Sequence, residues 1–342
     1  MTCRPGPIYE TETTQLSHHL VHCVGTCVRN RGKQRREVTN DGEWQQEDES
    51  KVVLLKGLPH ANERLVLFEA DIYNPHEFEP AIQGCHYVFH VATPKQHLSR
   101  SQFSNITEAA VSGAKSIVMS CIKSGTVKRL IYTASVVSAS PLKDGGSGFK
   151  DSIDETCWTP LDLSFQYNND LHQKYTDSKT KTEKELLSYD NGGGLEVVTL
   201  ACGLVGGETL LSSLPLSVQL FISPLKDNEL AFYSVRFLEE LLGKVPIVHI
   251  GDVCEAHIFC IEKPSISGRF LVASSYVSSA DFANYCLQTY PDSRVKQKYL
   301  NGPKREIKWA STKLTDQEFV YKYDTKMIFD DCIRCATRLG HF

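Results

Sequence analysis

Short apolar runs, rich in β-branched and aromatic residues, recur along the chain and constrain its fold more than any other feature. They lie at residues 64–71, 87–93, 129–135, 195–202, 246–250 and 269–274. Each is almost continuously apolar, as strands covered by helices on both faces are. Segments with apolar residues at helical spacing separate them, at 76–84, 105–125, 176–190 and 252–264. This alternation predicts parallel βαβ units, and therefore an α/β fold with a doubly wound parallel sheet.

After residue 203 the alternation loosens. Three segments there have helical spacing, at 218–244, 279–291 and 324–340, and we expect them to form a smaller C-terminal lobe. Ligands of open parallel sheets bind at the carboxyl ends of the strands. A cleft between those strand ends and the second lobe is therefore the predicted site.

Composition excludes several classes of function. The chain has 342 residues, 41% of them hydrophobic, and a formal net charge of -4, which gives no electrostatic basis for binding nucleic acid. No apolar run reaches the ~18 residues of a membrane span or resembles a signal peptide, so we expect no membrane insertion and a cytoplasmic location. The 12 cysteines are scattered through apolar stretches, which predicts reduced core residues rather than a disulfide framework.

The segment KYTDSK contains the first candidate for chemistry. Tyr175 precedes Lys179 by four positions, which places both side chains on one face of a predicted helix. A nearby ammonium lowers the pKa of a phenol towards neutrality, and Ser135, at the end of its apolar run, would hydrogen-bond the same substrate oxygen. About one such spacing is expected by chance, which leaves a surface helix pair as the alternative. The position between the third and fourth apolar runs favours a carbonyl-reduction site that uses a nicotinamide hydride.

From about residue 47 onward the chain resembles a known family. The matching pieces include KVVLLKGLPHANERLVLFEADIYNP, AIQGCHYVFHVATP, VKRLIYTASVVSA, YTDSKTKTEKE and VHIGDVCEAHIFCIEKP. They are similar to the extended short-chain dehydrogenase/reductases of plant phenylpropanoid metabolism, among them dihydroflavonol, anthocyanidin, vestitone and cinnamoyl-CoA reductases. The resemblance implies a Rossmann-type sheet, NADPH as cofactor and a catalytic set of Ser135, Tyr175 and Lys179, with Tyr175 as the acid.

The resemblance also implies which residues bind NADPH. It assigns a basic residue to the 2′-phosphate, a pair to the adenine, a strand end beneath the cofactor and the residue after the fourth strand. In that order these are Lys51, Asp71 and Ile72, Val91, Ala92 and Thr93, and Cys202, together with Tyr175 and Lys179. Cys202 stands where relatives commonly have proline. The plain alternatives are a turn residue for Asp71 and core residues for Val91 and Ala92.

The N-terminus departs from the family pattern. A glycine-rich turn, close to G-x-x-G-x-x-[GA], should lie near residues 14–38, but only VGT at 24–26 is comparable and the next glycine is Gly32. Such glycines let the backbone approach a pyrophosphate at a helix N-terminus. We therefore expect residues 1–46 to be irregular, the first βαβ unit to be missing or degraded, and a buried sheet edge to be exposed. Residues 47–202 would be the NADP-binding domain, and residues 203–342 mainly the substrate lobe.

Other patterns support weaker hypotheses. A metal site made from the N-terminal histidines and cysteines lacks a second set of ligands at the usual spacing, and the basic run at 29–36 is typical of a solvated loop. A paired-cysteine redox motif near the C-terminus lacks the strand context that it needs. The residues concerned are His18, His19, His22, Cys23 and Cys27, and Cys332 and Cys335. We predict no metal.

Taken together, the sequence predicts an NADPH-dependent reductase of a flavonoid or related phenolic, acting as a monomer or homodimer. Ser140 stands where some relatives have a substrate-binding asparagine, which favours the anthocyanidin or vestitone reductase side of the family. Phe165, Tyr167 and Asn169, in the long loop, are expected to line an aromatic pocket. Two alternatives stay open: an inactive or unstable relic without its dinucleotide cradle, and a sugar-nucleotide epimerase or dehydratase on the same scaffold.

Overall fold

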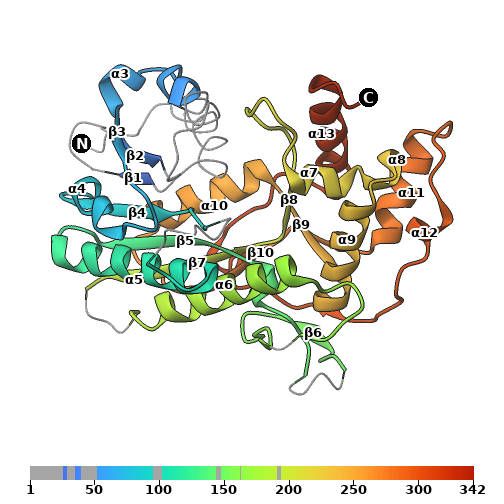
Figure 1. Ribbon diagram of the computed structural model, residues 1–342, viewed down its shortest axis with the longest axis horizontal. Helices are drawn as coiled ribbons and strands as arrows, with labels where there is room; N and C mark the ends of the chain where they lie inside the picture. The colour runs from blue at the N-terminus through green and yellow to red at the C-terminus, as the bar shows by residue number, and fades with distance from the viewer. Residues whose placement is uncertain are drawn as a thin grey trace.

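A seven-stranded sheet forms the centre of the molecule (Figure 1). The computed structural model describes residues 26–28, 35–39, 52–94, 102–143, 148–161, 163–190 and 194–342. In spatial order the strands are β10 (Gly268–Val272), β7 (Glu196–Cys202), β5 (Arg129–Ser135), β4 (Tyr87–His90), β1 (Thr26–Val28), β2 (Arg35–Thr39) and β3 (Leu65–Glu69). The predicted α/β fold is confirmed.

The two N-terminal strands lie between β4 and β3. β1 is antiparallel to both β4 and β2, whereas β2 is parallel to β3, and the remaining pairs are parallel. The prediction of an exposed edge is wrong for β4, because its backbone pairs with β1. The proposed metal ligands His18, His19, His22 and Cys23 and the glycine of VGT lie outside the described residues, as does Lys51.

Helices cover both faces of the sheet. α5 (Ile106–Ser124) and α6 (Asp170–Leu187) lie against each other on one face, and α10 (Ile250–Glu262) packs on the other (Figure 1). β5 shows how the sequence produces this layering, since successive strand residues point to opposite faces. Leu130 and Tyr132 join the core beneath α5 and α6, whereas Ile131 joins the core beneath α10.

The second lobe is built around a three-stranded sheet. β9 (Val245–His249) lies between β8 (Leu204–Gly206), to which it is parallel, and β11 (Ser275–Val277), to which it is antiparallel. Its helices are α7 (Leu216–Phe221), α8 (Ser223–Lys226), α9 (Glu229–Leu242), α11 (Ser279–Thr289), α12 (Gln297–Leu300) and α13 (Thr325–Arg338). Residues 246–250 were expected to form a strand, and they do so in this smaller sheet.

The described chain also contains several short elements. They are α3 (Ala61–Arg64), η1 (Pro75–Phe78), α4 (Glu79–Ile82), η2 (Val136–Ser138), η4 (Thr315–Gln317) and the parallel pair β6 (Ser152–Ile153) and β12 (Lys308–Trp309). Every cysteine whose side chain is described is a buried free thiol, as the sequence predicted. No helix in the described ranges is long and apolar enough to cross a membrane.

Gly203 marks the point where the chain leaves the large sheet for the small one. A Cβ at this position would lie 2.7 Å from the Pro246 carbonyl oxygen and 2.9 Å from its carbonyl carbon. Because both are backbone atoms of the neighbouring strand, β9 must shift to admit a methyl group. Glycine at residue 203 therefore sets how closely the two sheets approach each other.

Gly203→Ala is expected to lower the free energy of unfolding by about 1–3 kcal/mol, the usual cost of overpacking a core. Urea denaturation followed by circular dichroism measures this change. Gly302→Ala is the matched control, because its Cβ would approach no atom closer than 3.3 Å and the nearest is the side-chain oxygen of Ser279. Equal stability losses in the two variants would contradict the packing argument.

Candidate active site

The fold brings Ser135, Tyr175 and Lys179 together. Ser135 is the last residue of β5, and Tyr175 and Lys179 lie on α6, which begins six residues earlier than the sequence predicted because Asn169 caps it at Asp170. The side chains of Ser135 and Tyr175 lie close enough for Ser135 to influence the pKa of the phenol. Lys179 Nζ donates to the Thr133 carbonyl oxygen at 3.0 Å. These residues therefore surround the carboxyl end of β5.

Tyr175 is partly open to solvent, with 43% of its surface exposed. Burial raises the pKa of Tyr175, and the neighbouring Ser135 side chain offsets only part of this effect. The prediction of a pKa lowered by Lys179 is therefore wrong for this structure. The Lys179 ammonium donates to a backbone carbonyl instead, and Tyr175 keeps its proton at neutral pH.

Lys179 is 5% exposed, and its ammonium lies 5.1 Å from the centre of the Tyr132 ring. Burial lowers the pKa of Lys179 to about 8, although Cys202 and the Glu183 carboxylate act in the opposite direction. Desolvation disfavours the charged form of a lysine, yet a pKa of about 8 still leaves the side chain mostly protonated at pH 7. The site thus contains a buried cation.

A buried histidine supports the strand end from behind. His257 Nδ1 lies 2.7 Å from the Val253 carbonyl oxygen, and its Nε2 lies 2.7 Å from Thr133 Oγ1. Because a carbonyl only accepts, Nδ1 carries the proton and Nε2 accepts from Thr133. Burial lowers the pKa of His257 to about 4, so the ring stays neutral. No sequence pattern indicates this role, since His257 is simply one polar residue on a mostly apolar helix.

The end of β4 contributes a second buried histidine. His90 is 2% exposed, its ring lies 5.1 Å from that of Tyr132, and its Nδ1 has no hydrogen-bond partner in the described structure. Burial lowers the pKa of His90 to about 3, and the charge of Lys179 adds to the effect. Val91 and Ala92 follow and pack against opposite cores, and Thr93 is half-buried. Val91 and Ala92 are both half-buried at the end of β4, and their contact with a cofactor stays a prediction.

The proposed adenine pair lies just beyond β3. Asp71 Oδ1 accepts from the Tyr73 backbone N–H at 2.9 Å, so its carboxylate closes the turn, as the plain interpretation expects. Ile72 is buried against Gly113 of α5. A Cβ atom added at Gly113 would lie 2.6 Å from Cγ1 of Ile72. Cys202 ends β7 directly opposite Ser135 in the strand register, and burial raises the pKa of its thiol to about 12.

The aromatic residues of the long loop pack on α9. Phe165 lies 6.2 Å from Phe237, and Tyr167 lies 5.8 Å from Tyr233, between ring centres. Asn169 serves as the N-cap of α6, accepting from the His172 backbone N–H at 2.9 Å. The Asn169 side chain therefore caps a helix, whereas the sequence predicted that it would line an aromatic pocket. Ser140 is fully buried, and its hydroxyl donates to the Leu241 carbonyl, so it faces no substrate.

A mainly parallel α/β sheet, with a serine at the end of one strand and a tyrosine and a lysine on the helix beside it, is typical of the class of short-chain dehydrogenase/reductases. Within it, the chain belongs to the 3-beta hydroxysteroid dehydrogenase/isomerase family, whose sequence profile matches residues 41–261. It is an oxidoreductase of that family, and the resemblance found in the sequence is confirmed.

Named relatives refine this assignment. The chain is 33% identical to a putative anthocyanidin reductase from Ginkgo biloba, over 86% of this chain and 85% of the relative. It is 32% identical to dihydroflavonol 4-reductase from Zea mays, over 84% of this chain and 78% of the relative. The crystal structure of vestitone reductase from alfalfa (Medicago sativa) superposes with a TM-score of 0.69 at 28% identity, over 90% of this chain and 91% of that one.

Replacing Lys179 by methionine is expected to stabilise the protein at pH 7 by about 1–2 kcal/mol, because it removes a buried ammonium. The pKa of Lys179 is lowered from 10.5 to about 8 on folding. Between those values the unfolded chain binds more protons, so the stability of the unmodified protein rises with pH. The advantage of the variant should therefore shrink from pH 7 to pH 10.

Urea denaturation of both proteins at pH 7 and pH 10 measures how the difference between their free energies of unfolding changes with pH. Lys181→Met, at an exposed position on the same helix, is the control and should differ from the unmodified chain equally at both pH values. An advantage of Lys179→Met that grows as pH rises would show that the burial of Lys179 has been misjudged.

Proposed function

We propose that the protein is an NADPH-dependent reductase of a flavonoid or related phenolic carbonyl. The observation that carries this proposal is the convergence of Ser135, Tyr175 and Lys179 at the carboxyl end of β5. Membership of a dehydrogenase family and similarity to plant flavonoid reductases support it. Residues 47–202 would bind the dinucleotide, and residues 203–342 would contribute mainly to the substrate side.

The properties of Tyr175 suit a reduction. A phenol whose pKa is raised keeps its proton at neutral pH, and this is the protonation state of a general acid. Ser135, whose side chain already influences the pKa of that phenol, would donate to or orient the same substrate oxygen. Tyr175 then passes its proton to the oxygen of the carbonyl that is reduced.

The described residues fit a nicotinamide cofactor on the side where hydride transfer takes place. When bound, NADPH supplies the hydride. Lys179, which is mostly protonated at pH 7, would hold the ribose hydroxyls, and the orphan Nδ1 of His90 is a buried polar atom beside that position. Val91, Ala92 and Thr93 would form the floor of the site, and Asp71 with Ile72 would flank the adenine.

Two features support a flat phenolic substrate. Tyr233 is 42% exposed on α9 and packs with Tyr167, so an aromatic surface lies close to the start of α6. Leu171, in the first turn of α6, is 64% exposed. Ser140, in contrast, uses its hydroxyl within the core, which agrees with a substrate of the anthocyanidin or vestitone type rather than one held by a side-chain amide at that position.

Tyr175→Phe is expected to lower kcat by about 10²–10⁴-fold, because it removes only the proton donor. NADPH affinity should remain within about threefold of the unmodified chain, since the ring is retained. NADPH fluorescence titration and NADPH oxidation with an anthocyanidin, a dihydroflavonol and an isoflavanone measure these effects. Tyr290→Phe, at a residue of comparable exposure on the second lobe, is the control and should retain full activity.

The same titration separates the active enzyme from a relic. Saturable NADPH binding and turnover by the unmodified chain support the proposal. A chain that binds no NADPH, while a version with a glycine-rich βαβ unit in place of residues 1–46 does bind, would show that the catalytic residues persist without their cofactor. Full activity of Tyr175→Phe would overturn the assigned role of this residue.

A further inference from the structure

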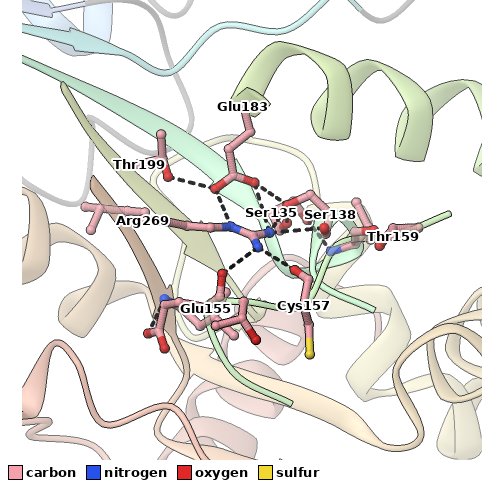
Figure 2. Close-up of polar contacts among 12 residues, drawn as sticks. Ser135, Ser138, Glu155, Cys157, Thr159, Glu183, Thr199 and Arg269 are labelled. Atoms are coloured by element: carbon pink, nitrogen blue, oxygen red, sulfur yellow. Dashed lines mark hydrogen bonds and ion pairs between the residues drawn. The ribbon is translucent and has the colours of Figure 1, made fainter. Parts of the chain in front are cut away.

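A buried carboxylate lies one helical turn beyond Lys179. Glu183 of α6 has no solvent-exposed surface, and Figure 2 shows polar groups converging on it from three other elements. Its Oε1 accepts from Thr199 Oγ1 of β7 at 2.7 Å and from Arg269 Nε of β10 at 3.0 Å. Its Oε2 accepts from Ser138 Oγ of η2 and from an Arg269 terminal nitrogen at 3.3 Å. Both oxygens are therefore fully used.

Arg269 is the counter-ion in this cluster. It is 5% exposed, and its guanidinium lies 3.7 Å from the centre of the Trp158 ring. Beyond Glu183 it donates to the Ser138 carbonyl at 3.0 Å, to the Glu155 carbonyl at 3.1 Å and to the Cys157 carbonyl (Figure 2). Each of these groups belongs to the chain that runs on from the end of β5, so the ion pair holds that segment against α6.

The cluster reaches the active site by two routes. The Ser138 hydroxyl has a single proton, which either the Glu183 carboxylate or the Ser135 carbonyl oxygen, 2.7 Å away, can accept. It therefore lies between the carboxylate and the backbone of the catalytic serine. Glu183 also shares a helical face with Lys179, four residues earlier, as i and i+4 residues do. The Glu183 carboxylate is thus connected to Ser135 through Ser138 and to Lys179 through the shared helical face.

We propose that Glu183, neutralised by Arg269, is a positioning residue for the reduction, which holds Ser135 and Lys179 in register and keeps the lysine charged. This inference rests on the function proposed above. The negative charge of Glu183 raises the pKa of Lys179 and offsets part of the effect of burial. Without it, the positive charge of Arg269 would remain in the same low-dielectric region and would disfavour a second cation.

The chain contains a second ion pair that lacks these links. Arg129 and Glu196 pair at the opposite ends of the same two strands, since Arg129 opens β5 and faces Glu196 of β7 in the register. Arg129 is 2% exposed. Its other acceptors are backbone carbonyls at the end of α10 and just beyond it. Glu196 is therefore the comparison for a carboxylate that contributes to stability and not to catalysis. Buried ion pairs contribute little more to stability than well-packed apolar residues do.

The test compares Glu183→Gln with Glu196→Gln in the full chain, by measuring kcat and kcat/KM for the carbonyl substrate from pH 6 to 10. Glu183→Gln is expected to lower kcat by about tenfold or more, as small displacements of catalytic groups do. It should also move the alkaline limb of the pH profile to lower pH by about 0.5–1 unit, because the charge of Arg269 is no longer balanced. Glu196→Gln should leave both unchanged within about twofold.

A third variant keeps the Glu183–Arg269 ion pair and removes the Ser138 hydroxyl, which contacts both members of the pair and the Ser135 carbonyl oxygen. Ser138→Ala should lower kcat by about threefold to tenfold and leave the alkaline limb in place, because the charges stay balanced. This result remains measurable if Glu183→Gln fails to fold. Equal kinetic effects of Glu183→Gln and Glu196→Gln, or Ser138→Ala activity equal to that of the unmodified chain, would overturn the positioning role.

Crystal structures of the Ser138→Ala and Glu196→Gln variants provide a readout that needs no turnover. We expect the Ser135 backbone to shift relative to β5 in the first and to stay in place in the second. If the unmodified chain reduces no carbonyl but this shift is observed, the positioning role holds and the proposed function fails. An unmoved Ser135 in Ser138→Ala would overturn the positioning role whatever the activity.

Discussion

The packing of α6 across the carboxyl ends of β5 and β7 is the constraint on which the rest of this structure depends. It buries the side chains of Lys179, Glu183 and Arg269 in one region of the protein interior. Two cations and one anion leave an excess of positive charge there, and burial makes that excess costly, as the lowered pKa of Lys179 shows. The same burial raises the pKa of Tyr175, so the site holds the phenol in its neutral form until a substrate oxygen accepts the proton.

Much of the fold could be predicted from the sequence, because strands that are buried on both faces appear as continuous apolar runs. The run at 129–135 is β5 without any change of boundary. The first turn of α6 was missed because residues 170–174 are largely polar and the signal there is the cap at Asn169 rather than apolar spacing. The strand predicted at 246–250 corresponds to β9, but its sheet was not predicted, since no apolar pattern records that the chain crosses at Gly203 into the smaller sheet.

The candidate site could be predicted from the sequence only in part. Spacing places Tyr175 and Lys179 on one face, but it does not say where an ammonium will point, and here it points to the Thr133 carbonyl. The direction of the Tyr175 pKa shift depends on the burial of one hydroxyl, which no pattern records. Glu183 and Arg269 lie 86 positions apart, and pairs of that separation become visible only when the chain is folded.

The direction of β1 bears on how a dinucleotide would be held. In this family the glycine-rich turn follows a parallel first strand and so emerges at the carboxyl edge of the sheet. Here Thr26 pairs with Phe89 and Val28 with Tyr87, so β1 runs from the carboxyl edge of the neighbouring strand towards its amino edge, opposite to the direction of the family pattern. Among the described residues, Lys179 is the buried cation at the carboxyl edge that has no partner carboxylate. A dinucleotide bound over β5 would therefore depend on the position and charge of that lysine, and the buried Glu183 beside it would influence both.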